Sequence, residues 1–465
     1  MFESIGGTGG GVTAGAPTPA VPLTVAGLAR VATELAALDR EVSDAERIDQ
    51  IRVLEELKAA CAAAQARATA DLDTSVCAEH AALKLPAARH GAGVAAQVAL
   101  ARRESPTRGT HHLGLAKALV HEMPHTLAAL TAGLLTEWRA TLLVRETACL
   151  TREHRAAVDT ELVADPTRLH GWGDKRLVAE AKKAAYRLDP HAALRRVRRA
   201  AADRRVTCRP APDTMAYLTA LLPVADAVAI YAALTKHADT HHGTTDDPRT
   251  RSQIIADTLV ERLTGRPAGQ PAGVEVQLVI TDHTLLGAGS EPAHLTGYGP
   301  VPPGWARDLI AKASATDAAW LRRLFTKPGT GDLVALDSRA RRFPAGLARF
   351  LDLRDGGTCR TPWCDAPIRH HDHVVAHHAG GPTTADNGQG LCEACNHAQQ
   401  APGWRAHPRP GPRHTVETTT PTGHTYHSTA PPLPGTDPPA RPTEPPLRPS
   451  RLEAHLTDLI LAMTA

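Results

Sequence analysis

Residues 354–404 read RDGGTCRTPWCDAPIRHHDHVVAHHAGGPTTADNGQGLCEACNHAQQAPGW and contain half of the eight cysteines of the 465-residue chain. Two pairs, C-x4-C and C-x2-C, are formed by Cys359, Cys364, Cys392 and Cys395. Paired thiols at these spacings, in a chain with no visible secretory signal, are typical of a metal site, and four thiolates close a tetrahedral zinc site. The segment has little apolar core, so we expect the zinc to be structural and to supply much of its folding free energy.

The residues between the two cysteine pairs are suited to chemistry. Asp372 and His373 precede a short predicted strand at 374–375, Asn387 follows a glycine turn, and Asn396 comes directly after the last cysteine on a predicted helix. Hydrolysis of a phosphodiester near neutral pH needs a base that deprotonates water and a cation at the scissile phosphate. A neutral imidazole, a carboxylate and an amide that can bind a divalent ion are a minimal set for that reaction.

These residues resemble the HNH endonuclease motif, a ββα-metal finger, in the version that four cysteines brace. The preceding stretch, PGTGDLVALDSRARRFPAGLARFLDLRDGGTCRTPWC at residues 328–364, follows a long helical region. This arrangement resembles the large actinobacterial family of HNH-containing proteins whose helical domain has no known function. The resemblance covers residues 25–405.

The resemblance implies a metal-dependent endonuclease that hydrolyses DNA, with a role for each motif residue. His373 would be the general base, and Asp372 would ligate a catalytic Mg²⁺, Mn²⁺ or Ni²⁺. Asn396 would complete that cation site from the helix, and Asn387 would orient the loop and its strand. The four cysteines would hold structural Zn²⁺ apart from catalysis. Gln389 stands where such modules usually have a leucine that packs the loop.

The other histidines of this segment leave alternatives open. His397 follows the last motif residue and is either an additional metal ligand or phosphate contact, or a histidine on the helix surface. His377 and His378 lie in a glycine-flanked loop, and we expect both to be solvated. The same expectation holds for His370 and His371.

The rest of the chain favours a mainly α-helical fold, because apolar residues recur at helical spacing over most of residues 24–263. Aromatic residues make up 3% of the chain, so alanine, leucine and valine have to build the core. The predicted organisation is a disordered tail at 1–23, a mostly helical domain with a small α/β segment at 24–350 (short strands near 274–282 and 331–337), an HNH nuclease module at 351–407, a Pro-rich linker at 408–450 and a short C-terminal helix at 451–465.

Positive charge in this chain is local. Lys and Arg total 52 against 49 Asp and Glu, a net charge of +3, so no overall field draws the chain onto nucleic acid. One arginine-rich predicted helix either contacts a phosphate backbone or is a solvated face with Leu194, Val197 and Ala201 turned inward, and we favour the second interpretation. The arginines of this run are Arg195, Arg196, Arg198, Arg199, Arg204, Arg205 and Arg209, while Arg339, Arg341 and Arg342 are nearer to the nuclease module and more suited to flank its DNA.

Two function classes compete with the nuclease: a zinc-dependent DNA-binding module without catalysis, and a helical interaction protein whose zinc knuckle only braces the fold. The longest apolar run, residues 215–234, contains threonine, proline and aspartate, which argues against a membrane span. Residues 1–22 have no basic segment before an apolar one, so no secretory signal is predicted. We expect a cytoplasmic protein that binds DNA and no membrane.

Overall fold

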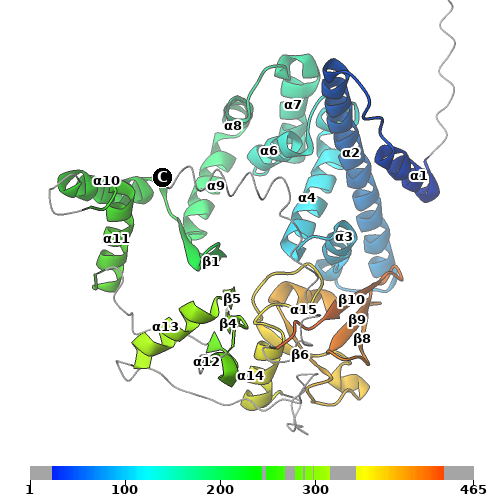
Figure 1. Ribbon diagram of the computed structural model, residues 1–465. Coiled ribbons are helices and arrows are strands. Elements are labelled where there is room, and N and C mark those ends of the chain that lie inside the picture. The colour runs from blue at the N-terminus through cyan, green and yellow to red at the C-terminus, as the bar shows by residue number, and fades with distance from the viewer. Residues whose placement is uncertain are drawn as a thin grey trace, which may run out of the picture.

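A computed structural model describes residues 23–242, 248–267, 278–285, 289–296, 298–314 and 342–433 (Figure 1). Most of these residues are helical, and the strands form small antiparallel sheets, so the predicted mainly α fold is confirmed. None of the described helices is both long and apolar enough to cross a lipid bilayer. Residues 1–22 of the predicted tail, the predicted strand at 331–337 and the predicted helix at 451–465 lie outside the described residues.

The first part of the structure, here called the helical body, is a bundle rich in alanine and leucine. Its helix α2 packs with a row of buried alanines, including Ala59, Ala63 and Ala66, against α4 and α5. Small side chains let the helix backbones approach, and Leu119 and Leu130 fill the remaining space. The helices of this body are α1 (Val25–Ala36), α2 (Asp44–Ala82), α3 (Val94–Arg102), α4 (Pro106–Glu122), α5 (Pro124–Thr131), α6 (Glu137–Thr147), α7 (Arg152–Val163), α8 (Asp174–Leu188) and α9 (Pro190–Ala202).

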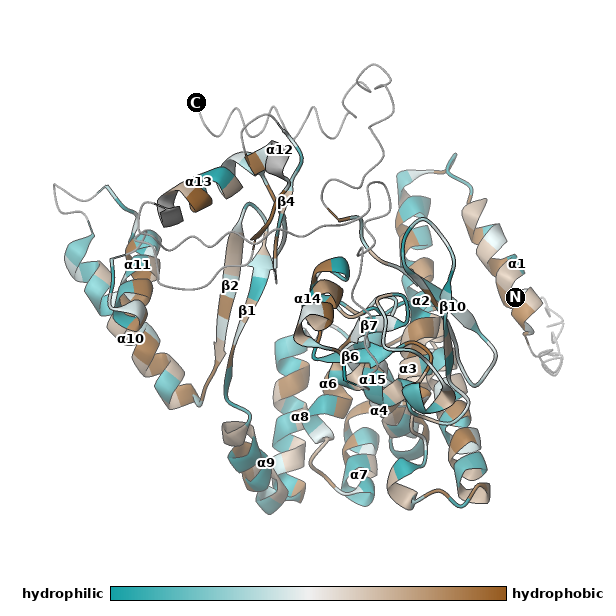
Figure 2. Ribbon diagram, turned by 90° about the horizontal axis from the view of Figure 1, so that it is seen from below, coloured by the Kyte–Doolittle hydropathy of each residue, from teal (hydrophilic) through white to brown (hydrophobic). Residues whose placement is uncertain are grey.

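An arm of helices and short strands leaves the helical body after α9, as Figures 1 and 2 both show. It begins with an antiparallel hairpin and a helix pair: β1 (Arg205–Ala211), β2 (Met215–Leu221), α10 (Val224–His241) and α11 (Arg251–Thr264). A three-stranded sheet with two helices follows: β3 (Leu278–Val279), α12 (Asp282–Leu285), β4 (Ala293–Leu295), β5 (Gly299–Val301) and α13 (Pro303–Ser314). In the part of the predicted strand at 274–282 that the structure describes, only residues 278–279 pair as a strand.

The C-terminal module, residues 342–433, carries the four cysteines and the motif residues. It consists of α14 (Ala345–Arg354), β6 (His370–His373), β7 (Gly388–Leu391), α15 (Glu393–Gln399), β8 (Arg405–Arg409), β9 (Thr415–Thr419) and β10 (Thr425–Thr429). β6 and β7 form an antiparallel hairpin that α15 follows. The last three strands form a separate antiparallel sheet in the order β10-β9-β8.

The predicted Pro-rich linker at 408–450 is wrong over its first part, because residues 405–429 form this sheet. Val416 and Thr418 bury their side chains and alternate with half-buried neighbours, as β-branched residues do in a partly buried strand. Pro408 lies in the edge strand β8, where proline is tolerated because one side of the strand needs no ladder partner. Residues 434–450 lie outside the described part of the chain.

The helical body packs closely against the C-terminal module at the start of α3. Gly93 has a φ of +87°, and a Cβ built there would lie 2.8 Å from the indole Nε1 of Trp404. Beside it, the hydroxyl of Thr422 donates a hydrogen bond of 3.0 Å to Gln97 on α3. Glycine at position 93 therefore allows α3 and the module to approach, so the candidate site below rests on the helical body.

Candidate metal centre

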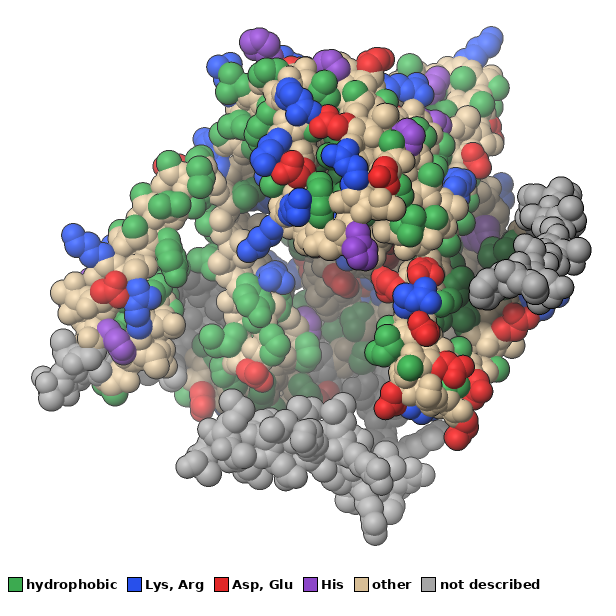
Figure 3. All heavy atoms as spheres, turned by 90° about the horizontal axis from the view of Figure 1, so that it is seen from above, with side chains coloured by type: hydrophobic (Ala, Val, Ile, Leu, Met, Phe, Trp, Pro, Cys, Tyr) green, Lys and Arg blue, Asp and Glu red, His purple; other side chains and the backbone are tan. Residues whose placement is uncertain are grey.

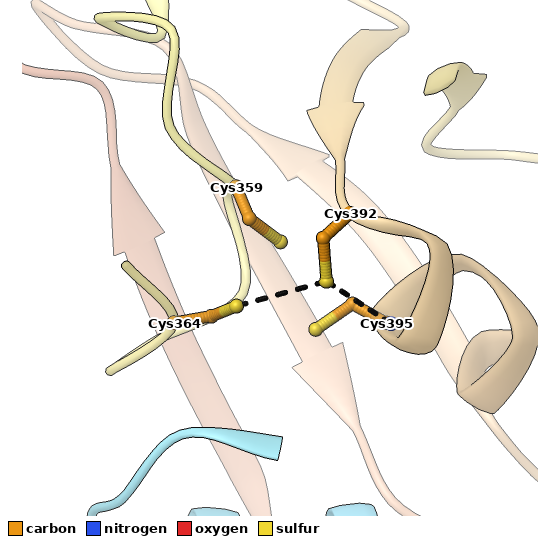
Figure 4. A group of neighbouring side chains, drawn as sticks. All are labelled: Cys359, Cys364, Cys392 and Cys395. Atoms are coloured by element: carbon orange, nitrogen blue, oxygen red, sulfur yellow. Dashed lines mark hydrogen bonds between the residues drawn. The ribbon is translucent and has the colours of Figure 1, made fainter. Parts of the chain in front are cut away.

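The four cysteines come from two chain segments that the module brings together (Figure 4). Cys359 and Cys364 lie on the loop between α14 and β6, where the Cys359 N–H donates to the Ala366 carbonyl at 2.9 Å. Cys392 caps α15, and Cys395 follows in the first turn of that helix. The backbone N–H of Cys395 points at the Cys392 sulfur, 3.4 Å away.

The geometry of the four sulfur atoms suits one metal ion. All four thiols are buried, and their sulfur atoms lie within 4.8 Å of one another. The Sγ atoms of Cys364 and Cys392 are 3.7 Å apart, too far for a disulfide bond of about 2 Å. Four sulfur atoms at about 2.3 Å from a tetrahedral zinc ion would be separated by about 3.8 Å.

The protonation states of these thiols depend on one another. Hydrogen bonds from the thiols of Cys364 and Cys395 lower the pKa of Cys359. The same contacts raise the pKa of Cys364 and of Cys395, because a second thiolate next to the first is repelled in a buried place. A divalent cation among them would remove that repulsion, so the predicted cysteine site is confirmed as a group that can hold a metal ion such as zinc.

The hairpin of β6 and β7 places the motif residues. His370 pairs with Leu391, Asp372 with Gln389 and His373 with Gly388. The predicted strand at 374–375 is therefore wrong by a few residues, because the pairing with β7 already ends at His373. Residues directly opposite each other in an antiparallel pair share a face, and neighbours along a strand lie on opposite faces.

His373 is buried on one face of this hairpin. Its side chain is 9% exposed, and its Nε2 lies 2.9 Å from the hydroxyl of Thr383. Its ring contacts Phe343 with a centroid distance of 4.7 Å and meets the ring of His377 edge-on at 5.5 Å. These contacts fix the direction of the imidazole. His377 itself is exposed, as predicted, although its ring leans on His373.

Asn387 locks the loop that follows His373. Its Oδ1 accepts a hydrogen bond from the Val375 N–H at 2.9 Å, and its Nδ2 donates to the carbonyls of Val375 and Pro382 at 3.0 and 2.8 Å. The Asn387 carbonyl accepts from the Val374 N–H at 2.8 Å. The side chain is thus fully used in closing the loop, which is the contact pattern expected of a residue that orients a loop and its strand.

Asp372 faces the other side of the hairpin, toward α15. Gln389, its partner across the strands, is 1% exposed and donates a hydrogen bond of 3.2 Å to Gln399 on α15. The hairpin face that carries Asp372 is therefore the one that α15 covers, and Asn396 comes from that helix. Among the described residues, the four cysteines are the only group of three or more Cys, His, Asp or Glu close enough to surround an ion.

Three charged residues that the sequence analysis did not single out hold this site together. Arg354 donates through Nε and Nη2 to the Asp355 carboxylate at 2.8 and 3.1 Å, and through Nη1 and Nη2 to the carbonyls of Ala385 and Gly388 at 2.7 and 2.8 Å. Asp355 also accepts from the Gly390 N–H at 2.8 Å. Both carbonyls flank Asn387, so this ion pair fixes the loop from the opposite side.

Arg360 extends the same cluster to the C-terminal sheet. Its Nη2 donates to the carbonyls of His414 and Ser428 at 3.2 and 2.5 Å, and its Nε lies 3.7 Å from Asp355. Burial lowers the pKa of Arg360 to about 10, which still leaves it charged at neutral pH. The adjacent Arg354-Asp355 pair, a few residues before the first cysteine, was the only signal in the sequence that could have pointed to this cluster.

The remaining candidates lie at the edge of the site. His397 and His378 are exposed, His370 is half-buried, and His371 pairs through Nε2 with Asp352 at 2.8 Å. The prediction that His371 is solvated is therefore wrong, because its imidazole pairs with the Asp352 carboxylate. Arg342 is exposed at the start of the module, whereas Arg339 and Arg341 lie outside the described residues.

Comparisons with known proteins place most of the chain in one family. No curated protein and no solved structure gives a significant match. The family described as "Domain of unknown function (DUF222)" matches residues 51–355, which are 305 of the 465 residues. The match runs from α2 to the end of α14 and stops four residues before Cys359. The chain therefore belongs to the DUF222 family.

Proposed function

We propose that the C-terminal module is a metal-dependent HNH endonuclease that hydrolyses phosphodiester bonds of DNA. The observation that supports this most is the β6–β7–α15 unit, in which a buried imidazole, a carboxylate and an amide project from one short hairpin and its helix beside a four-thiolate site. The order Asp372-His373, Asn387, Asn396 along this unit is the order of the HNH motif.

The four cysteines would hold structural zinc, which would fix the start of α15 relative to the hairpin. Asp372 and Asn396 would hold the catalytic Mg²⁺, Mn²⁺ or Ni²⁺, because carboxylate and amide oxygens suit such ions and both residues lie where α15 covers the hairpin. When bound, that cation would supply positive charge at the phosphate and at the leaving oxygen.

His373 would act as the base that takes a proton from the attacking water. The ring is held by Thr383 and Phe343 on the face opposite to Asp372, so base and cation would approach a phosphate from different sides. In-line displacement places nucleophile and leaving group on opposite sides of phosphorus, which matches such a division. Asn387 and Arg354 would keep the loop fixed while the phosphate is bound.

Support for DNA as substrate comes from the motif and from exposed arginines on the same module. Arg342, Arg369 and Arg405 are all exposed there, and arginine forms bidentate contacts with phosphates. Backbone contacts of this kind carry no base information, so the module alone would bind DNA with a steep salt dependence and little sequence preference.

The test is nicking of a supercoiled plasmid by the full chain with Mg²⁺, Mn²⁺ or Ni²⁺. We expect His373→Ala to slow cleavage by about 10²- to 10⁴-fold while zinc content and DNA affinity stay nearly unchanged. His378→Ala is the matched control, because His378 is an exposed histidine of the same loop, and it should behave like wild type.

Each other outcome assigns a different function. Salt-sensitive DNA binding without cleavage in any metal would mean that the module binds DNA and is catalytically inactive. Neither binding nor cleavage would favour a helical interaction protein with a bracing zinc knuckle. Loss of cleavage in His377→Ala but not in His373→Ala would show that the motif register assigned here is wrong.

A further inference from the structure

The helix α9 presents the opposite face from the one predicted for it. Ala192 and Ala193 are buried, whereas Leu194 and Val197 are 48% and 61% exposed, so the larger apolar side chains point away from the helical body. Leu194, Val197 and Ala201 follow the i, i+3, i+7 spacing with which a helix inserts into an apolar groove. The prediction that this stripe turns inward is wrong, because the alanine side of the helix packs on the body instead.

Arginines flank this exposed stripe. Arg195 and Arg198 are exposed beside it, and Arg196 is partly engaged with the helical body through the carbonyl of Glu146 at 3.0 Å. From Leu194 to Arg209 the chain has seven arginines and one aspartate, a net charge of +6. A basic amphipathic helix of this kind fits an apolar groove with an acidic rim.

The same chain has such a groove between α1 and α2. It has a volume of about 270 Å³, and its walls include Leu35, Leu38, Val53 and Leu57, with Glu46 and Asp49 at its rim. Leu35, Leu38, Val53 and Leu57 are each at least 40% exposed, and Leu54, which also lines the groove, is half-buried. Residues 34–56 contain eight acidic and three basic residues, a net charge of −5, and Figure 3 shows acidic side chains gathered on the side where Figure 1 places the start of α2.

The α9 of one copy lies far from its own groove. In both ribbon views α1 and α9 are on opposite sides of the helical body. The charges of residues 194–209 (+6) and residues 34–56 (−5) are nearly matched, and both segments expose apolar side chains that a bound partner would remove from water. The occupant that these surfaces fit is therefore a second copy of the chain.

We propose that the protein forms a two-fold dimer in which α9 of each copy docks into the α1–α2 groove of the other. Two-fold symmetry doubles the contact, because α9 of the first copy binds the groove of the second copy and α9 of the second copy binds the groove of the first. The charged rims would orient the partners, and Leu194 and Val197 would be the apolar anchors. This inference does not depend on the nuclease proposal.

The first test compares two valines of equal exposure. Val197 on α9 is 61% exposed and Val228 on α10 is 62% exposed, so Val228→Glu controls for the added charge on an exposed helix. In sedimentation of the full chain, Val197→Glu should weaken dimerisation by at least about 30-fold, whereas Val228→Glu should leave it unchanged. A wild-type chain that stays monomeric to about 100 µM, or a dimer that only Val228→Glu disrupts, would overturn the proposal.

The second test exchanges the charges between the two surfaces. A variant with Arg195→Glu and Arg198→Glu, and another with Glu46→Arg and Asp49→Arg, should each dimerise much more weakly, since like charges then face each other at the exchanged positions of both contacts. An equimolar mixture should associate again, because every α9 then meets a groove of opposite charge, and far-UV circular dichroism should show both variants folded. A mixture of folded variants that remains monomeric contradicts the proposal. So does a dimer that all these variants leave intact, or an arginine variant that loses only DNA binding.

Discussion

In the helical body the least exposed large side chains are apolar, such as Leu119, Leu130 and Leu177. Buried polar side chains, such as Asp159 and Glu146, are fewer there, whereas the smaller C-terminal module buries Asp355, Gln389 and Asn387, two arginines and the four cysteines. Apolar contacts are numerous and have no preferred direction, so a bundle can shift slightly without losing stability. Buried polar contacts fix distance and direction, and each one left without its partner is costly. The module therefore holds side chains in place more strictly and depends on each of them more strongly.

The largest expected effect is the loss of one thiolate from the module. Structural zinc contributes on the order of 10 kcal/mol of apparent folding free energy in small metal domains. We expect about one zinc per wild-type chain, and we expect Cys395→Ser to lose the zinc and unfold the module while the helical body keeps its far-UV helix signal. Metal analysis, circular dichroism and limited proteolysis measure this.

Cys61→Ser is the control for that experiment, because Cys61 is an exposed cysteine of α2. It should change neither the zinc content nor the proteolysis pattern. Wild-type protein that contains no zinc when purified without chelator would contradict the prediction.

The second effect concerns the ionic cluster. Asp355→Asn leaves Arg354 and Arg360 buried without a counter-charge, and breaking a buried ion pair in this way costs about 3–5 kcal/mol. Urea unfolding followed by limited proteolysis of the module should show the loss. Asp365→Asn replaces an exposed aspartate on the knuckle loop and should change the free energy of unfolding by no more than about 0.5 kcal/mol. Equal effects of the two substitutions would mean that the cluster is not stabilising.

The third effect concerns the helical body, where a core substitution should destabilise the bundle and leave the module intact. Leu130 is fully buried in α5, so Leu130→Ala should cost about 3 kcal/mol through lost burial and a cavity. Leu134, 61% exposed, is the matched control, and Leu134→Ala should be nearly neutral. Thermal unfolding measures the change, while bound zinc should stay at the wild-type level. Loss of zinc in Leu130→Ala would show that the two regions unfold as one unit.

The smallest effect is an acid sensitivity of the module. Burial, reinforced by the charge of Arg354, lowers the pKa of His414 to about 4. Between about pH 6.5 and pH 4 the unfolded chain therefore binds more protons at this residue, so stability falls as the pH falls, by about 2 kcal/mol at pH 5. Urea unfolding at pH 7 and pH 5 should show this loss in wild type and a smaller one in His414→Gln. The same pH dependence in both proteins would contradict the assignment.

The cysteine centre could be predicted because its four thiols come in two closely spaced pairs, and such spacing is typical of a site for a single metal ion. The loop contacts of Asn387 are local as well, since its partners Val375 and Pro382 lie only 12 and 5 residues away. Only the adjacent Arg354-Asp355 pair of the ionic cluster is visible in the sequence. The carbonyls of Ala385 and Gly388 that Arg354 also binds are 31 and 34 residues away, and no side-chain pattern reveals backbone carbonyls.

Two predictions were wrong for different physical reasons: the inward orientation of the Leu194 stripe on α9, and a linker where the C-terminal sheet lies. The sequence of α9 contains two apolar stripes, one of alanines and one of Leu194 and Val197, and periodicity cannot show which of them meets a neighbour. In the C-terminal segment, proline and threonine content suggested a linker, although threonine is a good strand former and Pro408 sits at an edge.

The position of Pro408 has a consequence for self-association through β-strands. β8 is an outer strand of its sheet, and such strands can template pairing with strands of other molecules. Proline removes one N–H donor from β8, and Arg405 and Arg409 place positive charge on either side of it. Proline and charged residues on an edge strand are features with which natural β-sheets resist aggregation, so this edge of the module is protected against cross-β growth.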